Sequence, residues 1–169
     1  MIETPRLLIR PLEPRDFDAL LALSQDPQVT RYLDRSSDGE EGTWRRLLAQ
    51  IGHFQVFGTA MMAAEERGSG RFAGQMGFLH MRRGHGPDFD RDPEAGWTLA
   101  GWAQGKGLAR EGMEALLAGL GARRTVAMID PANAPSLRLA GRLGYRPMRE
   151  APYHERPVVL LERPGAAAG

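Results

Sequence analysis

A glycine-rich segment around the only lysine of the chain has the residue types best suited to chemistry. It reads Gln104-Gly-Lys-Gly-Leu-Ala109, and the residues after it place Met113, Leu116 and Leu120 at helical spacing. A helix N-terminus presents unpaired backbone N–H groups and the positive end of the helix dipole. Glycines let a phosphate oxygen approach those donors without meeting a Cβ atom. The segment therefore predicts an anion site, best suited to a pyrophosphate.

Two commoner phosphate-binding loops do not match this segment. A P-loop needs four residues between its first glycine and the Gly-Lys pair, but only three separate Gly101 from Gly105. The dinucleotide-binding fingerprint requires a small residue where Arg110 stands. A glycine-rich turn that binds no ligand is the remaining alternative.

The elements that must position this segment alternate along the chain. The strand Glu94–Leu99 leads into it and the helix Leu108–Leu120 follows. A loop of twelve residues, 82–93, precedes that strand. The whole order is β-α-α-β-β-β-α-β-α-β-β, which predicts an α/β protein with helices packed on a mixed sheet. The remaining strands are expected at 6–11, 59–65, 72–81, 125–129, 146–150 and 157–162, and the remaining helices after Asp16, after the start signal Ser36–Gly39 and after Asn133.

Composition limits the class of protein. The chain has 169 residues, 42% of them hydrophobic and 25% charged, with a net charge of +1 and no cysteine. These values predict one globular domain at 1–163 with a flexible tail at 164–169, and they give no reason to expect nucleic acid as a partner. No apolar segment approaches the ~20 residues that span a bilayer, so we expect a cytoplasmic protein without a membrane partner.

Four motifs follow one another along the chain. They are Thr4-Pro-Arg-Leu-Leu-Ile-Arg10-Pro, Glu94-Ala-Gly-Trp97, Gln104–Ala109, and Asp130-Pro-x-Asn133-x-x-Ser136-x-Arg138 with Leu143-Gly-Tyr145. In this order they resemble the GNAT superfamily of N-acetyltransferases, in particular its ribosomal-protein N-terminal acetyltransferase branch. The resemblance covers most of the chain and implies the GNAT α/β fold, acetyl-CoA as co-substrate and acyl transfer to an amine.

The resemblance implies a set of residues for the co-substrate. Backbone N–H groups of the glycine-rich loop would bind the pyrophosphate. The strand residues Trp97 and Leu99 would pair with the pantetheine arm, and one N–H there would polarise the acetyl carbonyl. Asn133 would hydrogen-bond the arm, and Arg142 would pair with a phosphate unless it is a solvated helix arginine. The loop residues are Gln104, Gly105, Lys106, Gly107, Leu108 and Ala109.

Catalytic roles follow from the chemistry of an amine acceptor. An alkylamine with a pKa near ~10 is mostly protonated at neutral pH, so a base is needed. Glu94 is the candidate base, with a structural ion pair as the alternative. Many relatives carry a tyrosine acid where this chain has Ala140, so Ser136 is the substitute acid unless it only caps a helix. Tyr145 is the other candidate, more often a core residue at this position.

Acidic and histidine residues give no metal motif. Asp88, Asp90 and Asp92 begin like a calcium loop, but Pro93 replaces the required glycine. These acids are expected either to face solvent or to recognise a cationic amine. His80 and His85 lack the glutamate of a zinc motif. We therefore expect no metal.

Two functions remain open from the sequence. The leading one is an acetyl-CoA-dependent N-acetyltransferase that acts by direct transfer in a ternary complex. The absence of cysteine excludes an acyl-thioenzyme intermediate, whereas composition alone leaves a serine ester open. Its acceptor would be a small-molecule or peptide amine, and the protein a monomer or homodimer. The alternative is a non-catalytic acyl-CoA-binding module.

Overall fold

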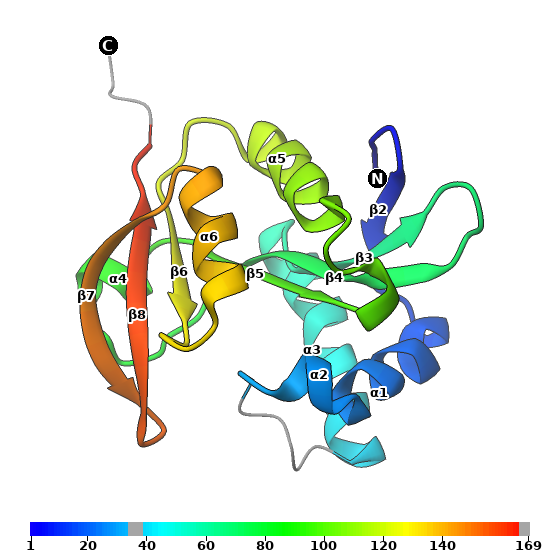
Figure 1. Ribbon diagram of the computed structural model, residues 1–169, viewed down its shortest axis with the longest axis horizontal. Coiled ribbons are helices and arrows are strands. Elements are labelled where there is room, and N and C mark those ends of the chain that lie inside the picture. Colours follow the sequence, from blue (N-terminus) through cyan, green and yellow to red (C-terminus); the bar gives the residue numbers. More distant parts are fainter. Residues whose placement is uncertain (34–38, 166–169) are drawn as a thin grey trace.

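One sheet of eight strands forms the centre of the molecule (Figure 1). The computed structural model describes residues 1–33 and 39–165, and every structural statement below refers to those residues. The strands lie in the order β1-β2-β3-β4-β5-β6-β8-β7, and only β5 and β6 run parallel. The sheet is therefore mixed, as predicted. The strands are β1 (Ile2–Glu3), β2 (Leu7–Pro11), β3 (Met61–Glu66), β4 (Phe72–Leu79), β5 (Glu94–Leu99), β6 (Thr125–Ile129), β7 (Arg146–Tyr153) and β8 (Arg156–Arg163).

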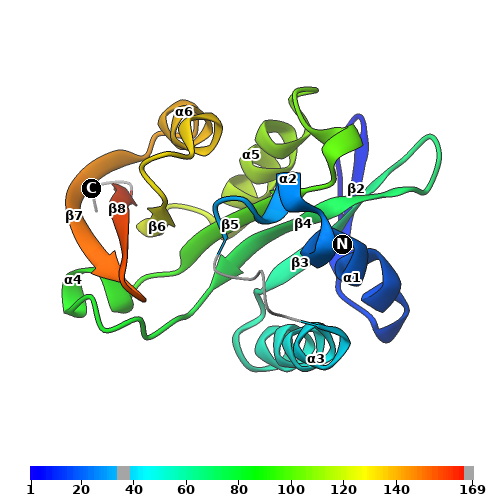
Figure 2. The same ribbon diagram turned by 60° about the horizontal axis from the view of Figure 1, so that its bottom comes forward.

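Helices cover both faces of the sheet. Figure 2 shows α5 and α6 on one face and α3 on the other. Two short 3-10 turns, η1 (Pro14–Asp16) and η2 (Gly101–Ala103), precede α1 and the glycine-rich loop. The helices are α1 (Phe17–Gln25), α2 (Pro27–Thr30), α3 (Glu40–Phe57), α4 (Pro87–Asp90), α5 (Leu108–Leu120) and α6 (Ala134–Arg142).

Strand β3 shows how the sequence divides the core between the two faces. Successive side chains of a strand point to opposite faces. Accordingly, Met62 and Ala64 pack in the core beneath α5, whereas Met61 and Ala63 pack with Leu47 of α3. All of these residues are buried, because both faces of this strand are covered by helices.

The expected order of elements is confirmed, and the structure adds β1, α2 and α4. Helix α4 lies within the expected loop 82–93 and buries Phe89, an isolated apolar residue that no periodicity could mark. Strand β7 continues to Tyr153, past its expected end at Glu150. The helix-start signal at Ser36–Gly39 lies outside the described residues except for Gly39, which is the N-cap of α3. Of the expected tail 164–169, only the first two residues are described.

Strands β5 and β6 diverge soon after they meet. Their register joins Glu94 to Val126, and no further pair is recorded between these two described strands. Strand β5 nevertheless stays paired with β4 as far as Leu99, which lies opposite Gly74. The carboxyl ends of β5 and β6 are therefore separated, and the helices α5 and α6 that follow them begin on either side of the opening (Figure 1).

Helix α5 lies close to the sheet because of a glycine. Gly112 is buried, and a Cβ atom at this position would fall against Sδ of Met76, with Cδ1 of Ile9 at 3.2 Å. Both neighbours are fully buried strand residues. Gly112 therefore fixes the distance between the sheet and the helix whose N-terminus carries the glycine-rich loop.

Candidate active site where β5 and β6 diverge

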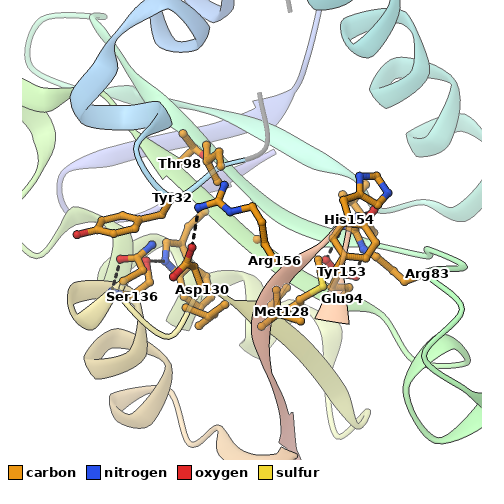
Figure 3. A pocket seen from close by; sticks show the side chains of 18 of the residues that line it. Tyr32, Arg83, Glu94, Thr98, Met128, Asp130, Ser136, Tyr153, His154 and Arg156 are labelled. Atoms are coloured by element: carbon orange, nitrogen blue, oxygen red, sulfur yellow. Dashed lines mark hydrogen bonds and ion pairs between the residues drawn. The ribbon is translucent and has the colours of Figure 1, made fainter. Parts of the chain in front are cut away.

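Two adjoining cavities occupy the opening between β5 and β6. The loop-side cavity, about 550 Å³, lies against the glycine-rich loop and the first turns of α5 and α6. The hairpin-side cavity, about 270 Å³, lies between β5, β6 and the tip of the β7–β8 hairpin (Figure 3). Because they share a wall, a ligand in one cavity can meet a ligand in the other. The shared residues are Tyr32, Leu33, Trp97, Thr98, Asn133 and Ser136.

The glycine-rich loop is shaped to receive an anion. Gly105 and Gly107 have φ angles of 71° and 78°, which favour glycine, and a Cβ at Gly105 would meet nothing within 4 Å. Within the described residues, no hydrogen bond is recorded from the backbone N–H groups of 105–110. The first backbone bond of α5 is Glu111 N–H to Gly107 O, at 3.1 Å. Consecutive unpaired donors at a helix N-terminus are what a pyrophosphate requires.

The side chain of Lys106, the lysine of this loop, lies outside the loop-side cavity. Lys106 is exposed and does not line the loop-side cavity, although its neighbours Gly105 and Gly107 do. Its Nζ lies 5.2 Å from the centroid of the Trp102 ring, and Cζ of Arg71 lies 4.3 Å from the same ring. Lys106 can therefore contribute its backbone N–H to the loop while its side chain makes a cation–π contact.

The N-terminal motif forms hydrogen bonds with the glycine-rich loop and with the first turn of α5. Glu111, in the first turn of α5, accepts hydrogen bonds from Thr4 Oγ1 at 2.6 Å and from Nε of Arg6 at 2.6 Å. Nη1 of Arg6 also donates to the carbonyl oxygen of Lys106, at 2.8 Å. Burial alone would raise the pKa of Glu111, but these hydrogen bonds outweigh it and lower the pKa. The carboxylate thereby fixes α5 to the strand β2 region.

The backbone of β5 offers unpaired groups to the opening. Alternate residues of a strand direct their backbone groups to the same side. Ala100 N–H bonds Ala73 O on the β4 side, whereas Pro93 O accepts from Val126 on the β6 side. Trp97 and Leu99 lie an even number of residues after Pro93. Their backbone groups therefore point to the same side as those of Pro93, toward the opening. The carbonyl oxygen of Leu99 is already held, because Nε2 of Gln104 donates to it at 3.0 Å.

Three predicted residues meet at the start of α6. Asn133 is the N-cap of this helix, and its Oδ1 accepts from Ser136 N–H at 3.2 Å. Ser136 Oγ in turn accepts from Nε1 of Trp97, at 3.2 Å. Asn133 rather than Ser136 is thus the capping residue, and the hydroxyl of Ser136 faces the shared wall of the two cavities.

Glu94 lines the hairpin-side cavity in a bidentate ion pair with Arg83. Nε and Nη2 of Arg83 lie 2.7 Å from the two carboxylate oxygens, and Nη1 donates to the hydroxyl of Tyr153 at 2.8 Å. The side chains of Glu94 and Arg83 are only 9% and 16% exposed. Burial would lower the pKa of Arg83, but the hydrogen bonds to Glu94 and Tyr153 outweigh it and raise the pKa. The expected alternative, an ion pair, is thus present beside the cavity.

A second ion pair, between Arg156 and Asp130, lines the same cavity. Nη2 of Arg156 donates to Oδ2 of Asp130 at 2.8 Å. Asp130 directly follows β6, and its Oδ1 also accepts from Ala132 N–H, at 2.8 Å. Figure 3 shows the guanidinium of Arg156 reaching from the hairpin toward Asp130 and Thr98. The cavity therefore contains two carboxylates and two guanidinium groups.

Two predicted residues lie apart from this chemistry. Tyr145 lines neither cavity: it is buried in the core, and its hydroxyl is 2.8 Å from Oγ1 of Thr125. Burial raises the pKa of Tyr145 to about 12, although the hydrogen bond to Thr125 opposes the shift. Its position fits the core role better than the acid role. Arg142 lines the loop-side cavity from the exposed last turn of α6.

The acidic residues before β5 are engaged in structural contacts. Asp88 pairs with Arg149, and Asp92 pairs with Arg124. Asp90 accepts from the backbone N–H groups at 83 and 84. None of these acids lines either cavity, so the structure does not bring them to an acceptor. Among the described residues, no group of three or more potential ligands could hold a metal ion, and no helix is long and apolar enough to cross a membrane.

Sequence reasoning missed the side chains that the hairpin brings to the cavity. Arg83 comes from the connection between β4 and β5, and Tyr153 and Arg156 come from the strand ends that flank the β7–β8 turn, where no periodicity marks them. Tyr32 comes from the segment after α2, whose structure the sequence left ambiguous. The one signal in the sequence was Ala140, which stands where many relatives carry a tyrosine acid. Its presence indicated that a hydroxyl group would have to come from another part of the chain.

Comparisons with known proteins agree with this geometry. A family model described as an acetyltransferase (GNAT) domain matches residues 6–146. N-acetyltransferase p20 of Bacillus licheniformis, itself uncharacterized, is 26% identical over 148 residues, which are 85% of this chain and 80% of that protein.

Solved structures give the same result. A Bordetella pertussis protein assigned to the GNAT acetyltransferases is 37% identical, with a TM-score of 0.86 over 96% of this chain and 98% of that one. Spermidine N-acetyltransferase of Vibrio cholerae, solved with CoA and spermine, shares the fold at 15% identity, with a TM-score of 0.71 over 94% of this chain and 95% of that one. Because these relatives are acetyltransferases, they do not support the alternative of a non-catalytic acyl-CoA-binding module. The chain belongs to the GNAT family of acetyltransferases and is an acyltransferase enzyme.

Proposed function

We propose that this enzyme is an N-acetyltransferase that transfers the acetyl group of acetyl-CoA directly to a primary amine in a ternary complex. The observation that carries the proposal is the continuity of the two cavities along β5. One cavity begins at the unpaired N–H groups of the glycine-rich loop, and the other contains Glu94. A donor and an acceptor bound in these cavities would meet at Trp97 and Ser136.

The loop-side cavity suits coenzyme A. Its pyrophosphate would accept hydrogen bonds from the N–H groups of 105–110, with no Cβ atom in the way at Gly105. Arg142 lines this cavity and would pair with a phosphate group, and Asn133 would hydrogen-bond the pantetheine arm. The positive end of α5 adds to the attraction.

The opened strand β5 suits the pantetheine arm and the thioester. The backbone groups of Trp97 and Leu99 face the opening, where β6 no longer pairs with them. An amide of the arm would take the place of the missing strand partner. One backbone N–H would then hold the carbonyl oxygen as it gains negative charge, an effect on the order of 3 kcal/mol per donor.

The acceptor enters as an ammonium group, and its nitrogen loses two protons in the reaction. The first proton leaves before the nitrogen attacks the thioester carbon. As the C–N bond forms and the C–S bond breaks, the second proton leaves the nitrogen and replaces the proton that is given to the departing thiolate. Glu94 is the proposed proton acceptor: Arg83 occupies one lone pair on each carboxylate oxygen, and each oxygen retains another. Ser136, at the shared wall, is the proposed donor to the departing thiolate, whose thiol has a pKa of only ~8.5.

Calorimetric titration is the first test. Acetyl-CoA should bind with micromolar affinity, whereas ATP and NAD, which also carry phosphates, should not compete with it. A panel of amines should then release CoA in an acetyl-CoA-dependent assay, with the N-acetyl product identified by mass spectrometry. Binding of NAD or ATP in preference to acetyl-CoA would contradict the proposed loop. Acetyl-CoA binding with no acetylated amine would contradict the proposed reaction.

A further inference from the structure

The two guanidinium groups of the hairpin-side cavity differ in how much of their hydrogen-bonding capacity is used. Arg83 has three recorded side-chain contacts, two to Glu94 and one to Tyr153. Arg156 has one, between Nη2 and Asp130, and within the described part of the chain none is recorded from its Nε or Nη1. Its side chain is 41% exposed against 16% for Arg83. Arg156 is therefore the group that retains N–H donors for a ligand.

The β7–β8 hairpin holds Arg156 in place by a tight turn. Tyr153 and Arg156 are paired across the strands, which leaves His154 and Glu155 as a two-residue turn with φ angles of 46° and 64°. This left-handed conformation suits Asn-Gly and costs other residues about 1–2 kcal/mol each. The ring of His154 stacks on Tyr153 with centroids 4.2 Å apart. A longer, relaxed turn would not present Tyr153 and Arg156 directly opposite each other at the cavity.

The charge of the cavity also restricts its ligand. Glu94 and Asp130 are each paired with an arginine, so the four groups balance. A polyamine or an aminoglycoside would bring several positive charges beside two guanidinium groups, and among the described residues that line the cavity no carboxylate is left unpaired. An amine that carries its own carboxylate would enter without adding net charge. The volume of about 270 Å³ is slightly below the ~300–1,000 Å³ of sites for drug-sized ligands, so a small acceptor fits.

We propose that the acceptor is an amino-acid-sized amine that also bears a carboxylate, and that Arg156 binds this carboxylate. The inference rests on the proposed function, because it concerns the acceptor of the same transfer. Nε and Nη1 of Arg156 donate to the acceptor carboxylate while Nη2 keeps its bond to Asp130. The acceptor amine then lies between this anchor and Glu94, on the β5 side of the cavity.

The test compares acceptors that differ only in their charge. Each amino acid of a standard set is assayed beside its amide and its decarboxylated amine, with spermidine as a polycation and a short peptide as a protein N-terminus. Charge-assisted hydrogen bonds to one arginine predict that kcat/KM for the best amino acid exceeds that for its amide by about 10- to 100-fold. Equal or better turnover of the amide, the peptide or spermidine overturns the inference while the proposed transferase function stands. If no amine is acetylated, both fail.

Variants of Arg156 assign the preference to this residue. In Arg156→Gln the ratio of kcat/KM between acid and amide should collapse toward one, mainly through a higher KM for the acid. Arg156→Lys, which keeps a charge beside Asp130, should retain part of the ratio. Arg146→Gln removes an exposed arginine of β7 outside both cavities and should leave the ratio as it is. Acetyl-CoA affinity, measured by calorimetry, shows that each variant is folded. A ratio unchanged in Arg156→Gln overturns the assignment.

Discussion

At the scale of single residues, Glu94 has a structural partner as well as a proposed catalytic role. Its carboxylate is nearly buried and is held in position by Arg83, which is itself bonded to Tyr153. A carboxylate buried without such a partner would be costly. The ion pair thus fixes the orientation of the group that we propose as the base, and the two interpretations of Glu94 are compatible.

Glu94→Gln should lower kcat by about 100- to 10,000-fold, because the amine loses its proton acceptor. Acetyl-CoA affinity should change little, since Glu94 lines only the hairpin-side cavity. Steady-state kinetics and calorimetry measure the two effects. Glu162→Gln is the matched control: Glu162 pairs with Arg124 at 2.8 Å, away from both cavities, and its loss should not affect kcat. A kcat within a few-fold of wild type in Glu94→Gln would rule out the base.

Tyr145 should make the protein less stable in alkali. Its pKa is about 12 in the folded protein, against ~10 in the unfolded chain. Between these values the unfolded chain has released the proton and the folded protein has not. The free energy of unfolding should therefore fall as pH rises from 10 to 12, by up to about 2–3 kcal/mol at ~1.4 kcal/mol per pKa unit.

Urea unfolding at pH 9 and pH 11.5 measures this loss. Tyr145→Phe should remove its share of the pH dependence, at a cost of about 1 kcal/mol at neutral pH for the lost bond to Thr125. The same pH dependence in wild type and Tyr145→Phe would show that other groups cause it.

At the scale of elements, the distance between α5 and the sheet depends on Gly112. Gly112→Ala would insert a methyl group against Met76 and Ile9, both fully buried, so we expect a destabilisation of about 1–3 kcal/mol. Gly119→Ala, in the last turns of the same helix, meets only Cδ1 of Ile2 at 3.8 Å. It should stabilise the protein by about 0.5–1 kcal/mol through helix propensity alone.

Denaturant unfolding of both variants measures the difference. If both substitutions change the free energy of unfolding in the same direction, α5 is free to move away from the sheet, and Gly112 does not fix the distance between them. Because α5 carries the glycine-rich loop at its N-terminus, Gly112→Ala should also weaken acetyl-CoA binding, whereas Gly119→Ala should not.

The sequence predicts those elements whose signals are local. The switch from strand to helix around Gln104–Ala109 and the start of a helix after Asn133 are encoded in neighbouring residues, and the structure has both features there. The contents of the hairpin-side cavity depend on long-range register. Arg83 and Tyr153 are 70 residues apart, and they meet because β7 pairs with β8 and β8 with β6. No spacing within one segment encodes that meeting.

At the scale of the whole molecule, the site lies where two neighbouring strands of the sheet have the fewest recorded residue pairs. The two parts of the sheet are joined at Glu94 and Val126 and then separate. A ligand that bridges the opening binds only the folded protein and should stabilise it. At 100 times its dissociation constant, acetyl-CoA should add about 2.7 kcal/mol, or roughly 5–10 °C in Tm.

Differential scanning calorimetry measures the shift in Tm, and hydrogen exchange locates it. Protection should increase most at Trp97, Leu99 and residues 105–110, whose N–H groups lack partners in the free protein. Strand β2, which lines neither cavity, serves as the internal reference. An equal increase throughout the sheet would indicate that the ligand does not bridge β5 and β6.

The exposed lysine beside Trp102 has one further consequence. Acetyl-CoA is a mild acylating reagent toward any ε-amine near it, and this chain has 21 arginines but only Lys106 to offer. Guanidinium groups are not acylated under these conditions, because they remain protonated. The surface is therefore almost inert to the proposed co-substrate. Mass spectrometry after long storage with acetyl-CoA should therefore find acetylation only at Lys106 and the α-amine.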